Sequence, residues 1–439
     1  MKSFRVAVLA NLKENAPVFD GMSEDQWDDL DSESTVLSLV NAIREGGHQA
    51  DFLEADDSII DTVRDYKPDI CFNIAESHFG DSREAQIPAI LEKLQIPYTG
   101  SKILTLALTL DKPMTKRILA WHNLPTPEFQ SFEREDEPLE EGMEFPLFIK
   151  PSREGTGMGI SYESILHNET ELRTQLRYIL RKYKQSALVE RYIEGREVTV
   201  GLVGNLIGPV ARRIPKDENA HRIQAGLQFL PPMEVNLEPW IEAGGVYGNV
   251  LKTDHAADLE YLCPAPLDED MVDELNWLAA AVFRVTGALD VARIDFRLDV
   301  HDNFKPYILE INPRASRTVP YVSKATGIPL AKLAARIIVG QKLKNMGLGD
   351  RPARAAWFAV KEAVLPFNRF AGVDPILGPE MKSTGEVMGL AASFEAAYWK
   401  SQLAAGQVLP PAGVVGLSAA DPDKSWMDTW RCRNNKNWR

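Results

Sequence analysis

The sequence predicts an α/β domain at the amino terminus, followed by a larger α+β region. Strand-like and helix-like segments alternate up to about residue 105, an order that is typical of a parallel sheet. Residues 288–317, in contrast, read as two strands joined by a polar turn at 301–303, which indicates an antiparallel hairpin. At 439 residues the chain is too long for one simple core, so we expect roughly two to four domains or subdomains.

The amino-terminal elements follow one another closely. Strands are expected at 4–9, 49–53 and 69–74, and helices at 35–45 and 83–94. Ligands of parallel sheets gather at the carboxyl ends of the strands. This rule places four polar residues at the mouth of a site: Asn11, Asn73, Glu76 and His78.

Composition limits the classes of function. Apolar residues make up 44% of the chain and charged residues 26%, as in folded soluble proteins. No apolar run is long enough to span a bilayer, and the start MKSFRVAVLANLK reads as a strand rather than a signal peptide, so we expect a cytoplasmic protein without a membrane partner. A net charge of −14 argues against a nucleic-acid partner. The three cysteines are scattered and lack a metal-type grouping, which fits a reducing compartment.

The hairpin carries oxygen-bearing side chains near neighbouring strand ends. Glu310 and Asn312 are two residues apart and therefore project from one face, and Asp295 can face them across the hairpin. Mg²⁺ prefers such hard oxygen ligands and is usually held by one or two carboxylates together with nucleotide phosphates. Arg293 would add positive charge beside the phosphates. The alternative is an ordinary hairpin with a solvated charged face.

A glycine-rich stretch, PSREGTGMGIS, follows a strand expected at 145–150. Its glycines Gly155, Gly157 and Gly159 would let backbone N–H groups approach phosphate oxygens, with Lys150 supplying charge beneath them. The stretch is neither a Walker A loop nor a GxGxxG dinucleotide turn. It indicates a phosphate-binding lid or, alternatively, a plain turn.

Two adjoining stretches resemble D-alanine:D-alanine ligases of the ATP-grasp superfamily: FNIAESHFGDSREAQIPAILEKL and IPYTGSKILTLALTLDKPMTKRIL. The resemblance implies an ATP-grasp fold, in which two subdomains clamp ATP. It implies that Lys112 touches the nucleotide phosphates and that Lys252 does so from a loop that closes the active site. Thr156 or Gly157 stands where the family has a serine in its glycine-rich loop. The chain between residues 215 and 266 is expected to be rich in loops.

The same resemblance assigns the nucleotide base to the strand in ALVERYIEGREVTV. Adenine would read the backbone from Glu190 to Ile193, with Glu190 facing its amino group and Glu197 facing the ribose. Arg191 stands where the family usually has lysine.

From residue 307 the resemblance changes. The runs YILEINPRASRTVPYVSKATGIPLAKLAARIIVG and VKEAVLPFNRFAGVDPILGPEMKSTGEVMG are similar to the second ATP-grasp unit of the carbamoyl-phosphate synthase large subunit, over about 288–410. This resemblance implies that Arg314 and Arg317 hold an anionic, carboxylate-type intermediate. The glutamine usual at the first metal position of that subunit is Asp295 here, as in the peptide ligases.

Together these patterns and resemblances predict five parts. They are an amino-terminal α/β domain preceding the ATP-grasp unit at 1–105, a small lid subdomain at 106–205, a large subdomain with the metal site at 206–345, a synthase-like continuation at 346–410, and a shortened regulatory-domain-like strand and tail at 411–439.

The expected function is ATP-dependent ligation of a carboxylate to an amine through an acyl-phosphate. The cofactors would be ATP and two Mg²⁺ ions, with Mn²⁺ as a substitute. The substrates would be small molecules such as an amino acid or a peptide, and the enzyme would be a homodimer. Two alternatives stay open at this point: a carbamoyl-phosphate-synthase-like enzyme that phosphorylates carbamate or bicarbonate, and a nucleotide-binding scaffold without catalysis.

Overall fold

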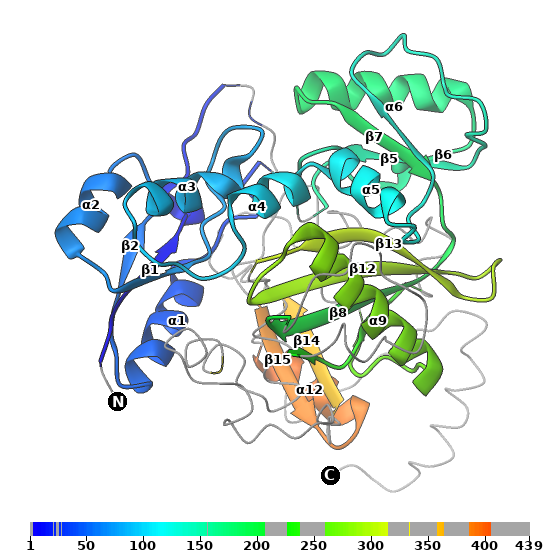
Figure 1. Ribbon diagram of the computed structural model, residues 1–439. Helices are drawn as coiled ribbons and strands as arrows, with labels where there is room; N and C mark the ends of the chain where they lie inside the picture. The colour runs from blue at the N-terminus through cyan, green and yellow to red at the C-terminus, as the bar shows by residue number, and fades with distance from the viewer. Residues whose placement is uncertain are drawn as a thin grey trace, which may run out of the picture.

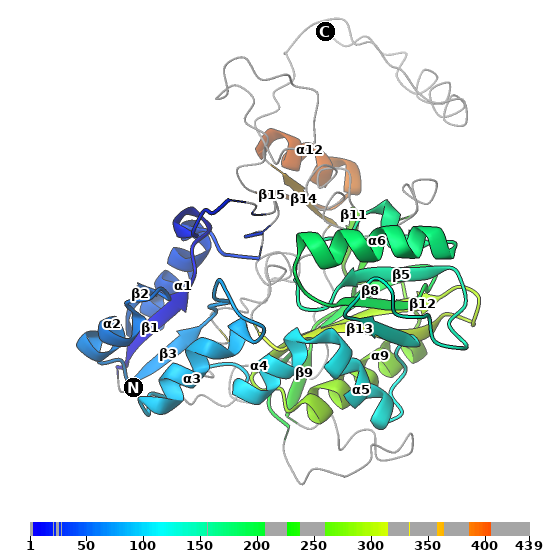
Figure 2. The same ribbon diagram turned by 90° about the horizontal axis from the view of Figure 1, so that it is seen from above.

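The computed structural model describes residues 3–20, 22, 26–27, 29–155, 157–206, 226–237, 260–314, 333, 358–363 and 386–404. Within these ranges the strands form four sheets (Figure 1). The expected α/β domain is followed by two sheets that face one another and by a small carboxyl-terminal unit (Figures 1 and 2). Three short 3₁₀ helices accompany them, η1 Lys13–Asn15, η2 Arg83–Ala85 and η3 Tyr162–Ser164.

The amino-terminal sheet is parallel, in the strand order β2-β1-β3, as the sequence predicted. Its elements are β1 Arg5–Ala10, α1 Glu33–Glu45, β2 Gln49–Glu54, α2 Ile59–Tyr66, β3 Ile70–Asn73 and α3 Gln86–Lys93. Alternate residues of β1 serve two cores: Val6 and Val8 belong to the cluster with α1, whereas Ala7 and Leu9 belong to the cluster with α2 and α3. Helices therefore cover both faces of the sheet. Helix α2 was not anticipated.

The lid sheet is antiparallel, in the order β4-β7-β5-β6, and is drawn at the upper right of Figure 1. Its elements are β4 Phe129–Phe132, β5 Leu147–Pro151, β6 Ile165–Leu166, α6 Glu169–Lys182 and β7 Ala187–Arg191. Leu172, Leu176 and Ile179 recur at helical spacing on α6 and are buried in one core with the strands. Asn168 caps this helix by accepting from the Glu171 N–H.

The large sheet lies below the lid sheet in Figure 1 and follows the order β11-β10-β8-β12-β13, with β9 paired to β8. Its elements are β8 Gly195–Gly204, β9 Leu227–Phe229, β10 Met233–Asn236, β11 Glu260–Leu262, α9 Glu269–Thr286, β12 Val291–Asp299 and β13 Lys305–Asn312. Helix α9 shares its core with β8, β12 and β13. The expectation of loops at 215–266 was wrong for the described part of that range, because 227–229, 233–236 and 260–262 are strands that extend this sheet.

The predicted hairpin is confirmed as β12 paired antiparallel with β13. Asp295 lies directly opposite Glu310, and Arg293 lies opposite Asn312. Between Asp295 and Phe296 the register shifts, so that Phe296 faces Ile308 and Leu309 has no opposite residue. This is a β-bulge on β13.

Helices α4 Ile103–Leu110 and α5 Lys112–Trp121 run from the amino-terminal domain to the two facing sheets (Figure 2). Asp111 caps α5 by accepting from the Met114 N–H, and Pro113 stands in the first turn. The carboxyl-terminal unit consists of β14 Phe358–Ala363, β15 Glu386–Ala391 and α12 Phe394–Ala404. Strand β14 contacts β11, which attaches this unit to the edge of the large sheet. The tail expected at 411–439 lies outside the described residues.

Candidate functional site

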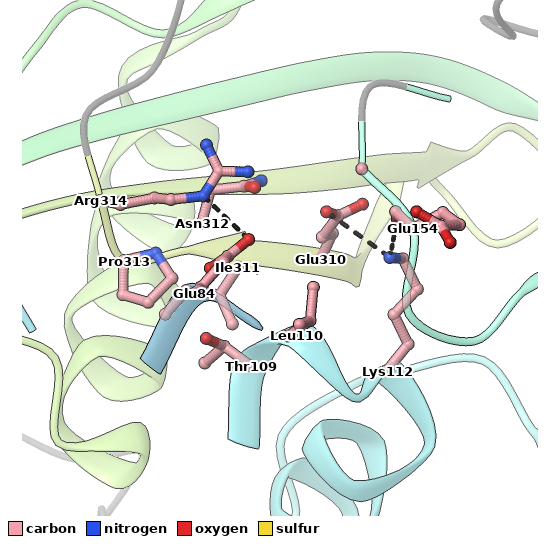
Figure 3. A pocket seen from close by; sticks show the side chains of 11 residues that line it. Glu84, Thr109, Leu110, Lys112, Glu154, Glu310, Ile311, Asn312, Pro313 and Arg314 are labelled. Carbon is pink, nitrogen blue, oxygen red and sulfur yellow. Dashed lines mark hydrogen bonds and ion pairs between the residues drawn. The ribbon is translucent and has the colours of Figure 1, made fainter. Parts of the chain in front are cut away.

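A small pocket lies where helices α4 and α5, the glycine-rich loop and strand β13 meet (Figure 3). Its walls come from distant parts of the sequence: Glu84, Thr109, Leu110, Lys112, Glu154, Gly155, Glu310, Ile311, Asn312, Pro313 and Arg314. Gly155 of the glycine-rich loop therefore lines one cavity with four other residues proposed from the sequence. They are Lys112, Glu310, Asn312 and Arg314.

Lys112 enters the pocket from the start of α5. Its backbone N–H donates to Ser152 O at 3.1 Å, which ties α5 to the strand end below the glycine-rich loop. Its ammonium donates to Glu154 O and lies 3.9 Å from Glu310 Oε1 (Figure 3). Burial lowers the pKa of Lys112, and the Glu310 carboxylate opposes that shift. The cation thus bridges the loop and β13.

The carboxylates of the hairpin have different surroundings. Asp295 Oδ1 accepts from Thr199 Oγ1 at 2.8 Å, and its Oδ2 accepts from Arg293 at 2.8 Å. Burial by itself would lower the pKa of Arg293, but Asp295 outweighs burial and the pKa is raised. Glu310, in contrast, turns into the pocket, with about a quarter of its side chain (27%) exposed.

These residues fit a magnesium ion. Among the described residues, no group of three His, Cys, Asp or Glu side chains could hold a metal, so Asn312 would have to complete the set. The Asn312 side chain is buried, and its Nδ2 has no hydrogen-bond partner in the described structure. A turn of the amide plane exchanges that nitrogen for the oxygen, which is a hard ligand facing the same pocket as Glu310.

Arg314 is held by two carboxylates of the amino-terminal domain. Its NH1 lies 2.7 Å from Glu76 Oε1, and its Nε lies 3.1 Å from Glu84 Oε1. Burial alone would lower the pKa of the guanidinium, but Glu76 and Glu84 outweigh it, so the pKa lies above its ordinary value. Glu76 was placed at the mouth of the parallel sheet from sequence, whereas the part played by Glu84 was missed.

The glycine-rich loop needs its glycines for two reasons. Gly157 and Gly159 have φ values of +83° and +71°, which L side chains rarely adopt. A Cβ on Gly159 would also lie 2.6 Å from Pro151 Cγ. Gly155 lies beside the pocket, where an added Cβ would be 3.7 Å from Arg314 NH2.

We expect Gly159→Ala to destabilise the lid by about 1–3 kcal/mol, because the substitution combines a strained φ with a steric overlap. Gly142→Ala is the matched control, since Gly142 has a φ of +95° but nothing within 4 Å of an added Cβ. Thermal and denaturant unfolding of both variants would separate the two effects. Equal losses would show that contact with Pro151 contributes nothing.

The other end of the site centres on Glu190, which is buried on β7. Lys150 on β5 donates to its Oε1 at 2.8 Å, and Lys116 on α5 is ion-paired with its Oε2 at 2.8 Å. Burial would raise the pKa of Glu190, but the two lysines outweigh burial and lower the pKa to about 2. Lys116 was missed in the sequence. Its spacing of four residues from Lys112, on one helix face, was the available signal.

Two candidate nucleotide contacts point to other partners. The Arg191 side chain pairs with Glu128 at 2.8 Å and lies over the Tyr307 ring, and Glu197 is 3.4 Å from Arg297. The Ile193 side chain is buried. Three further candidates, Thr156, Lys252 and Arg317, lie outside the described residues.

The other three residues expected at the mouth of the parallel sheet contact nearby backbone groups or aromatic rings. Asn11 donates to Ala55 O and accepts from the Ser77 N–H, and Asn73 accepts from the Ala75 N–H. The His78 ring meets Trp27 edge-on at 5.2 Å, and burial lowers its pKa. Asn11 and Asn73 therefore fix the loops that position Glu76.

Two facing sheets, a glycine-rich loop and a hairpin with paired carboxylates define the ATP-grasp fold, as the sequence predicted. A solved D-alanine–D-alanine ligase from Bacillus anthracis, in complex with ATP, has the same fold. It superposes with a TM-score of 0.55 at 19% identity, over 78% of this chain and 98% of that one.

Two family models match successive parts of the chain. The model described as D-ala D-ala ligase C-terminus matches residues 118–225, and the model described as carbamoyl-phosphate synthase L chain, ATP binding domain, matches residues 247–346. The two resemblances expected from the sequence are thereby confirmed, and with them the relationship to the ATP-grasp ligases.

Curated relatives are carbamoyl phosphate synthase large chains. That of Ralstonia nicotianae is 34% identical over 79% of this chain, and that of Neisseria meningitidis serogroup A is 49% identical over 37%. A carboxyl-terminal section of the large chain from Methanopyrus kandleri is 35% identical over 72%. This chain spans 29%, 15% and 53% of these three relatives, respectively.

Proposed function

We propose that this protein is an ATP-dependent carboxylate–amine ligase that forms an amide or peptide bond through an acyl-phosphate. The observation that carries the proposal is the pocket itself, in which Lys112, Glu310, Asn312 and Arg314 converge beside the glycine-rich loop. Phosphates need cations and N–H donors, and the metal that accompanies them needs hard oxygen ligands. The pocket is lined by both kinds of group: the cations Lys112 and Arg314, and the oxygen-bearing side chains of Glu310 and Asn312.

The residues divide the work in this proposal. Lys112 and Lys150 bind phosphate oxygens, and Arg293 holds Asp295 in position from two residues earlier on β12. Asp295, Glu310 and Asn312 would hold two Mg²⁺ ions, with Mn²⁺ as a substitute, and the metal would supply positive charge where phosphoryl oxygens become more negative. Lys252 and Arg317 keep their proposed roles at the phosphates and at the acyl group. The proposed adenine contacts are the backbone from Glu190 to Ile193 and the Glu190 carboxylate, and the proposed ribose contact is Glu197. Arg191 belongs to the same proposed nucleotide site.

Arg314 supports an anionic group at the reacting carbon, because its guanidinium faces the pocket and can form a paired contact with a carboxylate. Its present partners, Glu76 and Glu84, come from the amino-terminal domain. The substrates we propose are an amino acid or peptide as carboxylate and an amine as acceptor. A cytoplasmic location and a homodimeric state belong to the same proposal.

A second candidate is an enzyme that phosphorylates carbamate or bicarbonate. It is favoured by the 34% identity to carbamoyl phosphate synthase large chains over 79% of this chain. Against it stands Asp295, which lies opposite Glu310 where the resemblance to the synthase subunit implies glutamine. The two candidates differ in the compound that receives the phosphoryl group.

Phosphate release separates them. The purified protein would be incubated with ATP, Mg²⁺ and a panel of D- and L-amino acids, dipeptides or bicarbonate, and the products weighed by mass spectrometry. We expect release to depend on an amino acid or peptide, to ignore bicarbonate and to yield an amide. Bicarbonate-dependent release with trapped carbamoyl phosphate would establish the second candidate, and no release with any compound would favour a nucleotide-binding scaffold.

Lys150→Ala is expected to raise the KM for ATP and to lower kcat, because the lysine contacts phosphate before and during the reaction. Lys93→Ala is the control: it also removes one positive charge, but Lys93 is exposed at the end of α3. Steady-state kinetics with varied ATP would measure both. If Lys150→Ala matched the control, the glycine-rich stretch would be a turn without a phosphate site.

A further inference from the structure

Helix α5 presents two buried lysines on one face. Lys112 reaches the pocket near Glu310, and Lys116, one turn later, reaches Glu190 on the lid sheet. Only 1% of the Lys116 residue is exposed. Its ammonium has an ion pair of 2.8 Å to Glu190 Oε2, donates to Thr126 Oγ1 at 2.7 Å and lies 5.7 Å from the centre of the Phe129 ring.

Lys116 also connects the two sheets. Thr126, which accepts from Lys116, donates its own hydroxyl hydrogen to Ile308 O at 3.0 Å. Ile308 lies on β13, two residues before Glu310. The path Glu190, Lys116, Thr126, Ile308 therefore links the strand that we propose reads adenine to the strand that we propose holds the metal.

Glu190 is shared between two lysines that have different further contacts. Lys150 is buried on β5 and lies 5.9 Å from the centre of the Phe148 ring, and its proposed partner in the complex is a phosphate oxygen. If Lys150 turned to that phosphate without a replacement, Glu190 would be a buried carboxylate lacking its cation, which is strongly unfavourable. Lys116 has no such second task among its described contacts, which are Glu190, Thr126 and the Phe129 ring.

We propose that Lys116 is a positioning residue for the nucleotide: it keeps Glu190 ionised and aimed at the adenine amino group, and so frees Lys150 to bind phosphate. The inference rests on the proposed function, because it requires that ATP bind between the two sheets. It assigns no contact between Lys116 and the nucleotide. The effect of Lys116 passes through the Glu190 carboxylate.

The charge state of Lys116 gives the inference a pH signature. The pKa of Lys116 is lowered to about 8, chiefly by burial and also by the nearby Lys150, while Glu190 and Glu128 oppose the shift. Since Glu190 has its pKa lowered to about 2, it stays ionised throughout the neutral range. Lys116 is therefore charged below about pH 8 and loses its proton above it. Nucleotide affinity should weaken as the pH rises from 7.5 to 9.

The test compares Mg²⁺–ATP and Mg²⁺–ITP binding by calorimetry, because ITP carries a carbonyl in place of the adenine amino group. We expect Lys116→Met to weaken ATP binding about tenfold, as for the loss of one charge-assisted contact, and to weaken ITP binding less, because ITP lacks the amino group that Glu190 faces. Lys116→Arg should restore most of the ATP affinity and abolish the pH dependence. Lys93→Met, which removes an exposed lysine, should change neither.

The outcomes separate this inference from the proposed function. A wild-type protein that fails to bind ATP would refute the proposed function. If the wild-type protein binds ATP, an unchanged affinity in Lys116→Met would overturn the role of Lys116 altogether. Equal losses for ATP and ITP would overturn its role in aiming Glu190 at the adenine amino group. If Lys116→Met does not fold, the wild type decides: an ATP affinity that is constant between pH 7.5 and 9 would overturn the inference.

Discussion

Replacing Glu310 by glutamine is expected to reduce ADP formation at least about 100-fold, which corresponds to roughly 2.7 kcal/mol of barrier. The substitution keeps the size of the side chain but removes its charge from the position where a metal and phosphates would meet. The fold should survive, because Glu310 is partly exposed and its ion pair with Lys112 is long, at 3.9 Å. Turnover and thermal unfolding are measured on the same sample.

Glu194→Gln is the matched control for this experiment. Glu194 lies near the far end of β12, where it pairs with His301 at the surface. The control should leave turnover unchanged. If Glu310→Gln retained more than about a tenth of the wild-type activity, a loss of under ~1.4 kcal/mol of barrier, Glu310 would not belong to a metal site.

Phe296→Ala is expected to lower the free energy of unfolding by about 3–5 kcal/mol, as for other large-to-small changes in cores. Phe296 lies on β12 next to Asp295, but its ring points to the opposite face and is fully buried in the core beneath α9. Denaturant unfolding followed by circular dichroism would give the loss. Activity should fall with the folded fraction rather than through chemistry.

Phe304→Ala provides the comparison within the same hairpin. Phe304 lies in the turn, is 43% exposed and has a positive φ that alanine would share. It should change stability by less than about 1 kcal/mol. A similar loss in both variants would mean that burial in the core does not explain the importance of Phe296.

The parts of the fold with local patterns were predictable. The period-two alternation of β12 and the polar turn at 301–303 were sufficient for the hairpin, and the helix expected at 35–45 is α1, Glu33–Glu45. Helix α2 was missed. Its short run places Asp61 and Thr62 between Ile59 and Val63, and Asp65 beyond them, and only Ile59 and Val63 of the helix are buried.

The partners of the site residues were harder to predict, because they come from distant parts of the chain. Glu84 and Arg314 are separated by 230 positions, and only the approach of the amino-terminal domain to β13 joins them. For Arg191 the sequence predicted the strand but not the direction of the side chain. Its backbone lies on the expected strand, but the nearby Glu128 carboxylate and Tyr307 ring determine the direction of its guanidinium. Lys116, in contrast, was available from the four-residue spacing to Lys112.

The bulge at Leu309 shifts by one residue which positions of β13 face the core. Before it, residues 306 and 308 face the core side, and after it residue 311 does, so the parity of the inward positions changes from even to odd. Ile308 and Ile311 can therefore both pack in the core, while Glu310 and Asn312 line the pocket. Deleting Leu309 would make the ladder regular: with β12 held fixed, Ile308 would stay opposite Phe296, and Glu310 would stay opposite Asp295 on the pocket face.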